Sequence, residues 1–102
     1  MPPNARQLEA KEAINQALEL FHRRWMLRVL WELRERALNF RALQAACGDV
    51  SPTVLNQRLA ELRKAALVEA GTDGYALTAL GRELIVAFEP LSRWALRWRR
   101  SL

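Results

Sequence analysis

The sequence predicts a mainly α-helical domain that carries one small β-hairpin and ends in a long C-terminal helix. Apolar residues recur at spacings of three and four over most of the chain, and only residues 67–77 change to short runs around a glycine-bounded turn. Residues that cap helices also stand directly before three of the helical segments. These two patterns together indicate helices on either side of a single hairpin.

Composition favours one soluble domain over residues 1–102. The chain is 51% hydrophobic, enough for a packed core without a metal or a disulfide. Its 16 Lys and Arg against 11 Asp and Glu give a formal net charge of +5, which favours polyanionic partners. Residues 1–6 lack the apolar stretch of a secretion signal, and no later run is apolar enough to span a bilayer. We therefore expect a cytoplasmic protein with no membrane partner.

Two helices are expected before residue 37. Between residues 8 and 21, Ile14, Leu18 and Phe21 recur at helical spacing with charges elsewhere, which predicts an amphipathic helix. The segment 25–33 has too many consecutive apolar residues for a surface helix, so we expect it to cross the core. Charged residues 34–36 then end it in solvent.

A short helix with a complete start signal follows. Asn39 is suited to cap it, which places Leu38 and Leu43 at the two positions of a hydrophobic staple. Gly48 is suited to the left-handed conformation that commonly ends a helix. The segment 40–47 is therefore predicted to be helical.

The same pattern repeats at once. Ser51 is suited to cap a second helix, and Pro52 stands at its first position, where the missing N–H costs nothing. Val50 and Leu55 form a second staple. Two capped helices joined by a tight turn result.

The helix after Ser51 has two distinct faces. The inward face holds Leu55, Leu59, Leu62 and Ala66, and the outward face holds Thr53, Gln57, Ala60 and Lys64, flanked by Asn56 and Arg63. Small side chains and amides on a helix are what reading a DNA major groove requires. An ordinary solvated helix face explains the same pattern, and the two interpretations stay open on this pattern alone.

Residues 67–70 and 75–77 read as two short strands around a turn at 71–74. Thr78 is suited to cap the final helix, in which Pro90 should cause a kink or an interruption. Apolar residues follow one another there at steps of three and four: Leu80, Leu84, Phe88, Leu91, Ala95, Trp98 and Leu102. Such a stripe suits dimer packing, although packing on the chain's own core explains residues 80–88 equally well.

This order of elements is that of a winged helix-turn-helix, and residues 13–98 resemble the HxlR-type winged-helix regulators of bacteria. The resemblance rests on Trp25 with the apolar block 27–33, on Phe40 and Leu43, on the runs 51–62, 66–68 and 75–81, and on Leu91 and Trp94. It implies a homodimer formed by the terminal helices. It also implies that the helix after Ser51 lies in the major groove and the hairpin near the minor groove.

The chain departs from the family pattern at several places. It has residues 22–24 (His-Arg-Arg) where the family often has Gly-Lys, and Asn39-Phe40 where the family often has Arg-Phe. The hairpin is short, with no Arg or Lys between Lys64 and Arg82 to contact a minor groove. Many members sense oxidants through a cysteine ahead of the tryptophan, and this chain has none there, so that mode of sensing is not carried over.

We predict a sequence-specific DNA-binding transcriptional regulator that acts as a homodimer on an inverted-repeat operator in double-stranded DNA. The alternative is a winged-helix protein-interaction module that has lost DNA binding, which the small acidic hairpin would suit. Candidate DNA-binding residues are Asn39, Arg41, Ser51, Thr53, Asn56, Gln57, Arg58, Arg63 and Lys64. Of these, Thr53, Asn56 and Gln57 suit base contacts, whereas Arg58, Arg63 and Lys64 suit phosphate contacts or bracing of the fold. Candidate dimerisation residues are Leu18, Phe21, Leu84, Phe88, Leu91, Trp94 and Trp98.

The residues present do not indicate a catalytic site or a metal site. Cys47, the one cysteine, is expected to be a small buried hydrophobe, and His22 lacks partners for a metal site. The sequence has no nucleophile–base pair, phosphate-binding glycine loop or carboxylate dyad, so we expect no enzyme, no metal and no cofactor. The run 93–100 mixes Trp and Arg as a membrane-interface helix does, and a dimer helix with a basic end explains the same residues.

Overall fold

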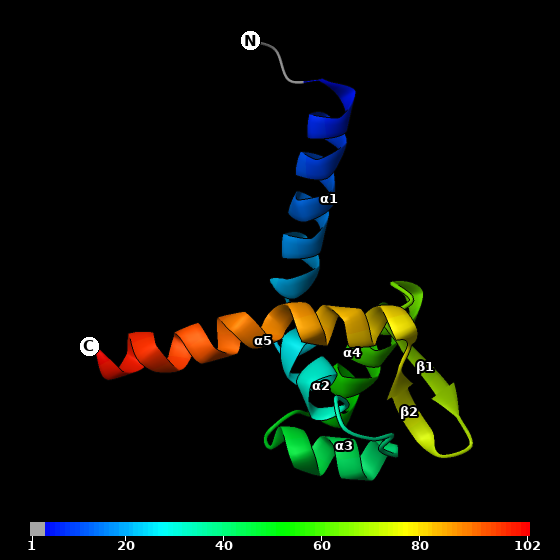
Figure 1. The fold of residues 1–102 in the computed structure, drawn as a ribbon. Helices are drawn as coiled ribbons and strands as arrows, with labels where there is room; N and C mark the ends of the chain where they lie inside the picture. The colour runs from blue at the N-terminus through cyan, green and yellow to red at the C-terminus, as the bar shows by residue number, and fades with distance from the viewer. Residues whose placement is uncertain (1–3) are drawn as a thin grey trace.

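A computed structural model describes residues 4–102; residues 1–3, part of the run weighed above as a secretion signal, lie outside the described residues. The elements are α1 (Ala5–Phe21), α2 (Met26–Glu32), α3 (Phe40–Cys47), α4 (Pro52–Lys64), β1 (Val68–Gly71), β2 (Gly74–Leu77) and α5 (Ala79–Arg100). Figure 1 shows α2, α3, α4 and the hairpin gathered in one body, with α1 extending away from it and α5 crossing it and continuing beyond. The predicted fold class, mainly α with one hairpin and a long last helix, is confirmed.

The three predicted caps are present. Asn39 Oδ1 accepts from the N–H of Ala42 at 2.9 Å, and Ser51 Oγ accepts from the N–H of Val54 at 3.1 Å. Thr78 Oγ1 likewise accepts from the N–H of Gly81 at 3.0 Å. Each contact satisfies a backbone donor that the first turn of a helix leaves without a partner.

The hydrophobic core lies between residues 26 and 77. Its buried members are Met26, Val29, Leu30, Leu33, Leu43, Cys47, Val50, Leu55, Leu59, Leu62, Leu67, Val68 and Leu77. They come from α2, α3, α4 and the hairpin with their connections, so α2 crosses the core as predicted. Within Ala5–Phe21 no residue is buried, and within α5 only Gly81 is. A Cβ at Gly81 would overlap the carbonyl oxygen of Leu67, because the first turn of α5 lies so close to the backbone at Leu67.

The hairpin is tied to the body through its backbone. β1 and β2 pair antiparallel with Val68 opposite Leu77. Leu38, in the connection between α2 and α3, donates its N–H to the carbonyl of Tyr75 at 2.9 Å and accepts the N–H of Tyr75 at 2.8 Å. Gly74 has a φ of 111°, and a Cβ there would lie 2.5 Å from the Leu38 carbonyl oxygen. Glycine is therefore required for the hairpin to lie this close to the connection.

Three features of the helices differ from the sequence expectation. α5 runs through Pro90 without interruption. The carbonyl of Val86, which loses its N–H partner there, lies on a face where Val86 is 69% exposed, so water can hydrate it. Ala66 lies beyond the end of α4 with a φ of 64° and is exposed, because this turn places Leu67 in the core instead. Gly48 ends α3 with a positive φ of 93°, but its ψ of −106° is not the left-handed helical value.

Candidate nucleic-acid interface

The polar face predicted for α4 is exposed along the whole helix. The outward side chains are Thr53, Asn56, Gln57, Ala60, Arg63 and Lys64. On the opposite side, Leu55, Leu59 and Leu62 are each no more than 2% exposed. These buried leucines fix the helix against the body, so the outward side chains are held on a rigid element.

The N-terminal ends of α3 and α4 hold the three other predicted DNA contacts. Asn39 and Ser51 use their side-chain oxygens as cap acceptors, so the amide Nδ2 and the hydroxyl proton are not consumed by the caps. Arg41 is exposed in the first turn of α3. The positive ends of both helix dipoles lie at these residues, which is favourable for a phosphate group.

Arg58 is held by its own chain. Its Nη1 donates to Glu61 Oε1 at 2.7 Å and its Nε donates to the carbonyl of Arg24 at 2.9 Å, while the side chain is only 15% exposed. The same Glu61 oxygen accepts from Arg23 Nη1 at 2.7 Å. Arg58 was expected either to contact phosphates or to brace the fold, and these contacts within the chain correspond to bracing. The network joins α4 to the connection between α1 and α2 and thereby helps to orient α4.

The two remaining cations of α4 differ in their surroundings. Lys64 lines a shallow surface groove together with Glu61 and with Gln16 and Glu19 of α1. Arg23 lines the same groove and pairs with Glu61 at 2.7 Å, so a second cation lies beside Lys64. Arg63 is exposed and does not line this groove.

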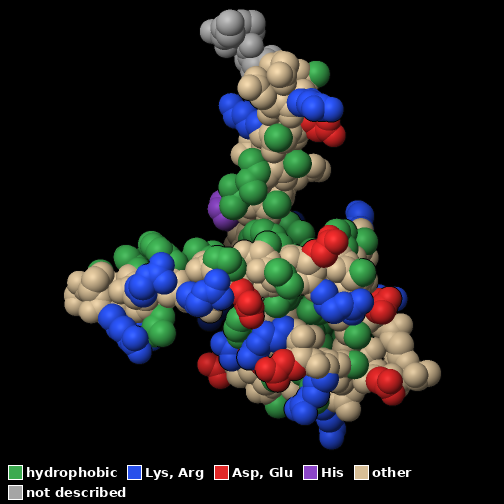
Figure 2. All heavy atoms as spheres, viewed as in Figure 1, with side chains coloured by type: hydrophobic (Ala, Val, Ile, Leu, Met, Phe, Trp, Pro, Cys, Tyr) green, Lys and Arg blue, Asp and Glu red, His purple; other side chains and the backbone are tan. Residues whose placement is uncertain are grey.

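The hairpin presents acidic side chains. Glu69 and Asp73 are both exposed, and Arg82, the first cation after Lys64, donates its Nη1 to the carbonyl of Leu77 at 3.0 Å. On the face shown in Figure 2, the hairpin tip carries no Lys or Arg side chain. The hairpin therefore supplies no cation for a phosphate or a minor groove.

The predicted dimerisation residues fall into two groups. Phe21, Leu84 and Phe88 are half-buried, Leu84 packs against the core, and the rings of Phe21 and Phe88 meet edge to face with centroids 6.0 Å apart. The other four are between 49% and 53% exposed: Leu18, Leu91, Trp94 and Trp98. Figure 2 shows hydrophobic side chains along both projecting helices. Leu84 and Phe88 thus pack within the chain, whereas Leu80, Leu91 and Trp98 of the same stripe are about half exposed.

The surroundings of Cys47 and His22 are not those of a reactive or metal-binding site. Cys47 is 4% exposed in the core, as predicted, and its burial, with a smaller contribution from Glu32, raises the pKa of the thiol. A protonated, buried thiol is a poor nucleophile. His22 is exposed, and within residues 4–102 no group of three or more His, Cys, Asp or Glu is arranged to hold a metal. None of the helices described is long and apolar enough to cross a membrane.

Two capped helices, a docked hairpin and a long last helix agree with the resemblance seen in the sequence, and the comparison with known families decides it. The HxlR-like helix-turn-helix family model matches residues 20–101. The chain belongs to this family. By name and fold, the HxlR-like proteins are helix-turn-helix transcriptional regulators.

The chain is also similar to individual proteins in sequence and in structure. The chain is 26% identical over 99 residues to the uncharacterized HTH-type transcriptional regulator YvaP of Bacillus subtilis, covering 90% of this chain and 92% of YvaP. Quinone-bound YodB of Bacillus subtilis superposes with a TM-score of 0.79 at 26% identity, over 84% of this chain and 98% of YodB. A possible HxlR family transcriptional factor of Thermoplasma volcanium superposes with a TM-score of 0.72 at 25% identity, over 81% of each chain.

Proposed function

We propose that this HxlR-family chain is a sequence-specific DNA-binding protein that reads an inverted-repeat operator as a homodimer. The observation that carries the proposal is the exposed polar face of α4, which sits on a helix fixed by three buried leucines. A helix presenting Asn56, Gln57 and Thr53 has the amide and hydroxyl groups that read base edges in a major groove. Family membership supports this interpretation over that of an interaction module without DNA binding.

The groups around α4 suggest a division of labour. Asn56 and Gln57 can each make a bidentate contact with adenine, which specifies sequence. Arg63 on α4 and Arg41 on α3 are exposed cations, which suit phosphate contacts that position the helix. Lys64 adds a phosphate contact at the end of α4 nearest to α1.

The exposed apolar side chains of α1 and α5 support the homodimer. Leu18, Leu91, Trp94 and Trp98 would leave a large apolar surface in water if the chain stayed alone, and such surfaces usually mark an interface. A two-fold dimer through these helices repeats α4 once per subunit. Two such helices in successive major grooves favour half-sites about one helical turn apart, roughly 34 Å.

The test is binding to duplexes selected from random DNA by the unmodified protein. Gln57→Ala should cost about 1–3 kcal/mol on the best site and little on random DNA, because an amide–base contact is lost. Asn15→Ala, an exposed amide on α1, is the matched control and should bind as the unmodified protein does. Affinity is measured by fluorescence anisotropy at several salt concentrations.

The same series tests the phosphate contact. Lys64→Ala should weaken binding to specific and random duplexes alike and should reduce the slope of log affinity against log salt by about one. Unmodified protein that shows no salt-sensitive duplex binding would contradict the proposal. Specific binding unaffected by Gln57→Ala and Lys64→Ala would show that α4 is not the reading helix.

A further inference from the structure

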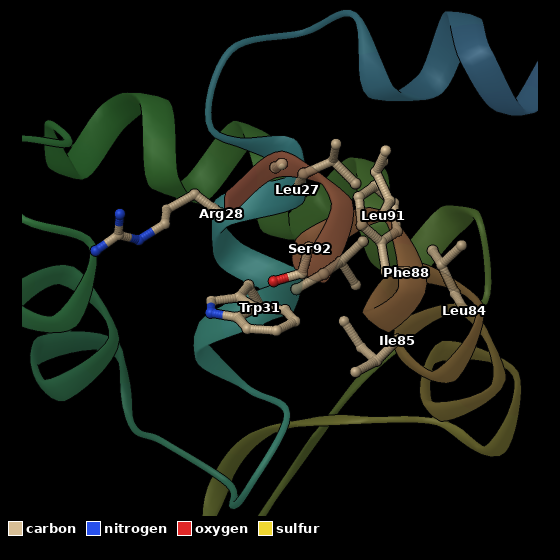
Figure 3. Close-up of a pocket in the computed structure, with 10 residues that line it drawn as sticks. Leu27, Arg28, Trp31, Leu84, Ile85, Phe88, Leu91 and Ser92 are labelled. Carbon is tan, nitrogen blue, oxygen red and sulfur yellow. The ribbon is translucent and has the colours of Figure 1, made fainter. Parts of the chain in front are cut away.

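An apolar pocket lies between α2 and the middle of α5 (Figure 3). Its volume is about 400 Å³, within the range of small-molecule sites. One wall comes from Leu27, Leu30 and Trp31 of α2, and the other includes Ile85 and Phe88 of α5. Nothing in the proposed DNA contact uses this pocket.

The pocket offers its occupant no charge. Arg28 lines it only with its stem, because the guanidinium pairs with Glu32 at 2.8 Å and donates to the carbonyl of Ala46 at 3.2 Å. Figure 3 shows that guanidinium directed away from the pocket and the Ser92 oxygen directed toward Trp31. Because transfer of an ion into such a site is costly, the lining is complementary to a neutral molecule with one hydrogen-bonding group near Ser92.

Two aromatic rings line the pocket, and both are held in place. The Arg34 guanidinium lies over the Trp31 ring at 4.2 Å, and Arg34 Nη1 also donates to the Trp31 carbonyl at 2.9 Å. Phe88 is held by its edge-to-face contact with Phe21. Fixed aromatic walls favour an aromatic occupant, which can pack offset or edge-on against them.

The predicted dimerisation residues overlap this pocket in part, since Leu84, Phe88 and Leu91 line it. Of the four dimerisation candidates that are about half exposed, only Leu91 reaches the pocket, whereas Leu18, Trp94 and Trp98 do not line it. A second subunit can therefore cover those three side chains without filling the pocket.

We propose that this pocket binds a neutral aromatic molecule of one or two rings whose single hydrogen-bonding group meets Ser92. Its two walls are α2, which belongs to the core, and α5, which carries the proposed dimer contact. An occupant would set the angle of α5 against the body and hence the distance between the two α4 helices of a dimer. This regulatory consequence rests on the proposed function, whereas the binding site itself does not.

The experiment titrates the protein of residues 1–102 with 1-naphthylamine, a neutral two-ring probe with one hydrogen-bonding group whose fluorescence changes in apolar surroundings. Saturable emission with one site per chain is expected. Ser92→Phe, which places a ring across the pocket from an exposed position, should weaken probe binding at least roughly tenfold. Leu96→Phe lies on the same helix outside the lining, and we expect it to bind the probe as the unmodified protein does. Far-UV circular dichroism verifies that both variants are folded.

A second readout locates the site without relying on a variant. In nitrogen–proton correlation spectra, the probe should shift the indole resonance of Trp31 and leave that of Trp98 in place. Absence of saturable binding, or a shift confined to Trp98, would overturn the proposal. Binding of the anion 1-naphthoate as tightly as the neutral probe would also overturn it, because the pocket provides no counter-charge.

Two further outcomes separate this site from its alternatives. If Ser92→Phe weakens self-association in sedimentation experiments while the unmodified dimer binds no probe, a second subunit fills the pocket and the proposal fails. If the probe binds and changes the DNA affinity of the unmodified protein but not that of Ser92→Phe, the regulatory role is supported. Probe binding with unchanged DNA affinity would rule out that role. Absence of DNA binding by the unmodified protein without any probe would instead contradict the proposed function.

Discussion

The body of the molecule and its terminal segments treat apolar side chains in opposite ways. Within residues 4–102, every buried hydrophobic residue lies in the body, residues 26–77. The large hydrophobic side chains that are exposed all lie in the terminal segments, residues 5–21 and 79–102: Leu8, Ile14, Leu18, Leu80, Val86, Leu91, Trp94, Leu96, Trp98 and Leu102. The body therefore holds the whole buried core, on which Leu20, Leu84 and Ile85 also pack, whereas the terminal segments carry the large apolar side chains that stay exposed. We therefore expect substitutions in the body to affect mainly stability and substitutions in the exposed stripe of α5 to affect mainly assembly.

The largest expected effect is on the stability of the body. Leu55→Ala removes a fully buried side chain from the centre of α4 and should lower the free energy of unfolding by about 2–5 kcal/mol. Leu96→Ala, the same change at an exposed position of α5, should stay within about 0.5 kcal/mol. Urea denaturation followed by circular dichroism measures both. Equal costs at the two positions would end the distinction between body and terminal segments.

The next effect is on assembly. Leu91→Asp combined with Trp98→Asp should weaken self-association about a hundredfold, or roughly 2.7 kcal/mol, because charges would enter an apolar interface. Val86→Asp is the control, since Val86 is 69% exposed and lies outside the apolar stripe. Analytical ultracentrifugation gives the dissociation constants. A protein that is already monomeric at micromolar concentration would contradict the homodimer.

A smaller difference in stability is expected between an ion pair of the body and one of the terminal segments. Glu61→Ala leaves the mostly buried Arg58 guanidinium without its carboxylate and should cost about 1–2 kcal/mol. Glu89→Ala breaks the exposed pair of Glu89 with Arg93, whose atoms are 3.9 Å apart, and should cost less than about 0.5 kcal/mol. Thermal unfolding at two salt concentrations compares them. Equal losses would show that the network around Arg58 does not brace α4.

The smallest expected effect is a pH dependence of stability caused by the buried thiol of Cys47. Burial raises the pKa of the Cys47 thiol in the folded state, so the folded chain keeps its proton at a pH where the unfolded chain loses it. Stability is therefore fully present below the ordinary thiol pKa of about 8.5 and falls as the pH rises above it. The loss should be at most about 1.4 kcal/mol one pH unit higher, and it should be absent in Cys47→Ala. Denaturation at pH 7 and pH 9.5 decides whether the difference between the two proteins changes with pH.

The helix starts could be predicted because capping is a local event. Asn39, Ser51 and Thr78 each bond a donor three residues ahead, and the sequence shows both partners. The same rule applies to the start of α1, which was not among the predicted caps: Asn4 and Gln7 form a reciprocal capping box there, at 2.8 and 2.9 Å. The exposed face of α4 was likewise visible as a helical period.

The features of the fold and of the site that could not be predicted from the sequence depend on contacts between residues far apart in the chain. Nothing local indicates that Trp25 adopts a φ of 77°, which is rare outside glycine and turns the chain from α1 into α2. The bracing of Arg58 by Glu61 and by the Arg24 carbonyl joins segments far apart in the chain. The pocket exists only because α5 crosses α2 as it does, and a helical period cannot predict that angle.

The bridge between Leu38 and Tyr75 has a consequence for the order of folding. Its two hydrogen bonds join chain segments that are separated by all of α3, α4 and β1, so the helix-turn-helix unit lies inside one closed loop. Closing a long loop costs conformational entropy, and only the contacts that the closed loop makes can offset this cost. Those contacts form only if α3 and α4 are already packed. We expect the hairpin to dock after the transition state, so a substitution that weakens this bridge should speed unfolding and leave the folding rate almost unchanged.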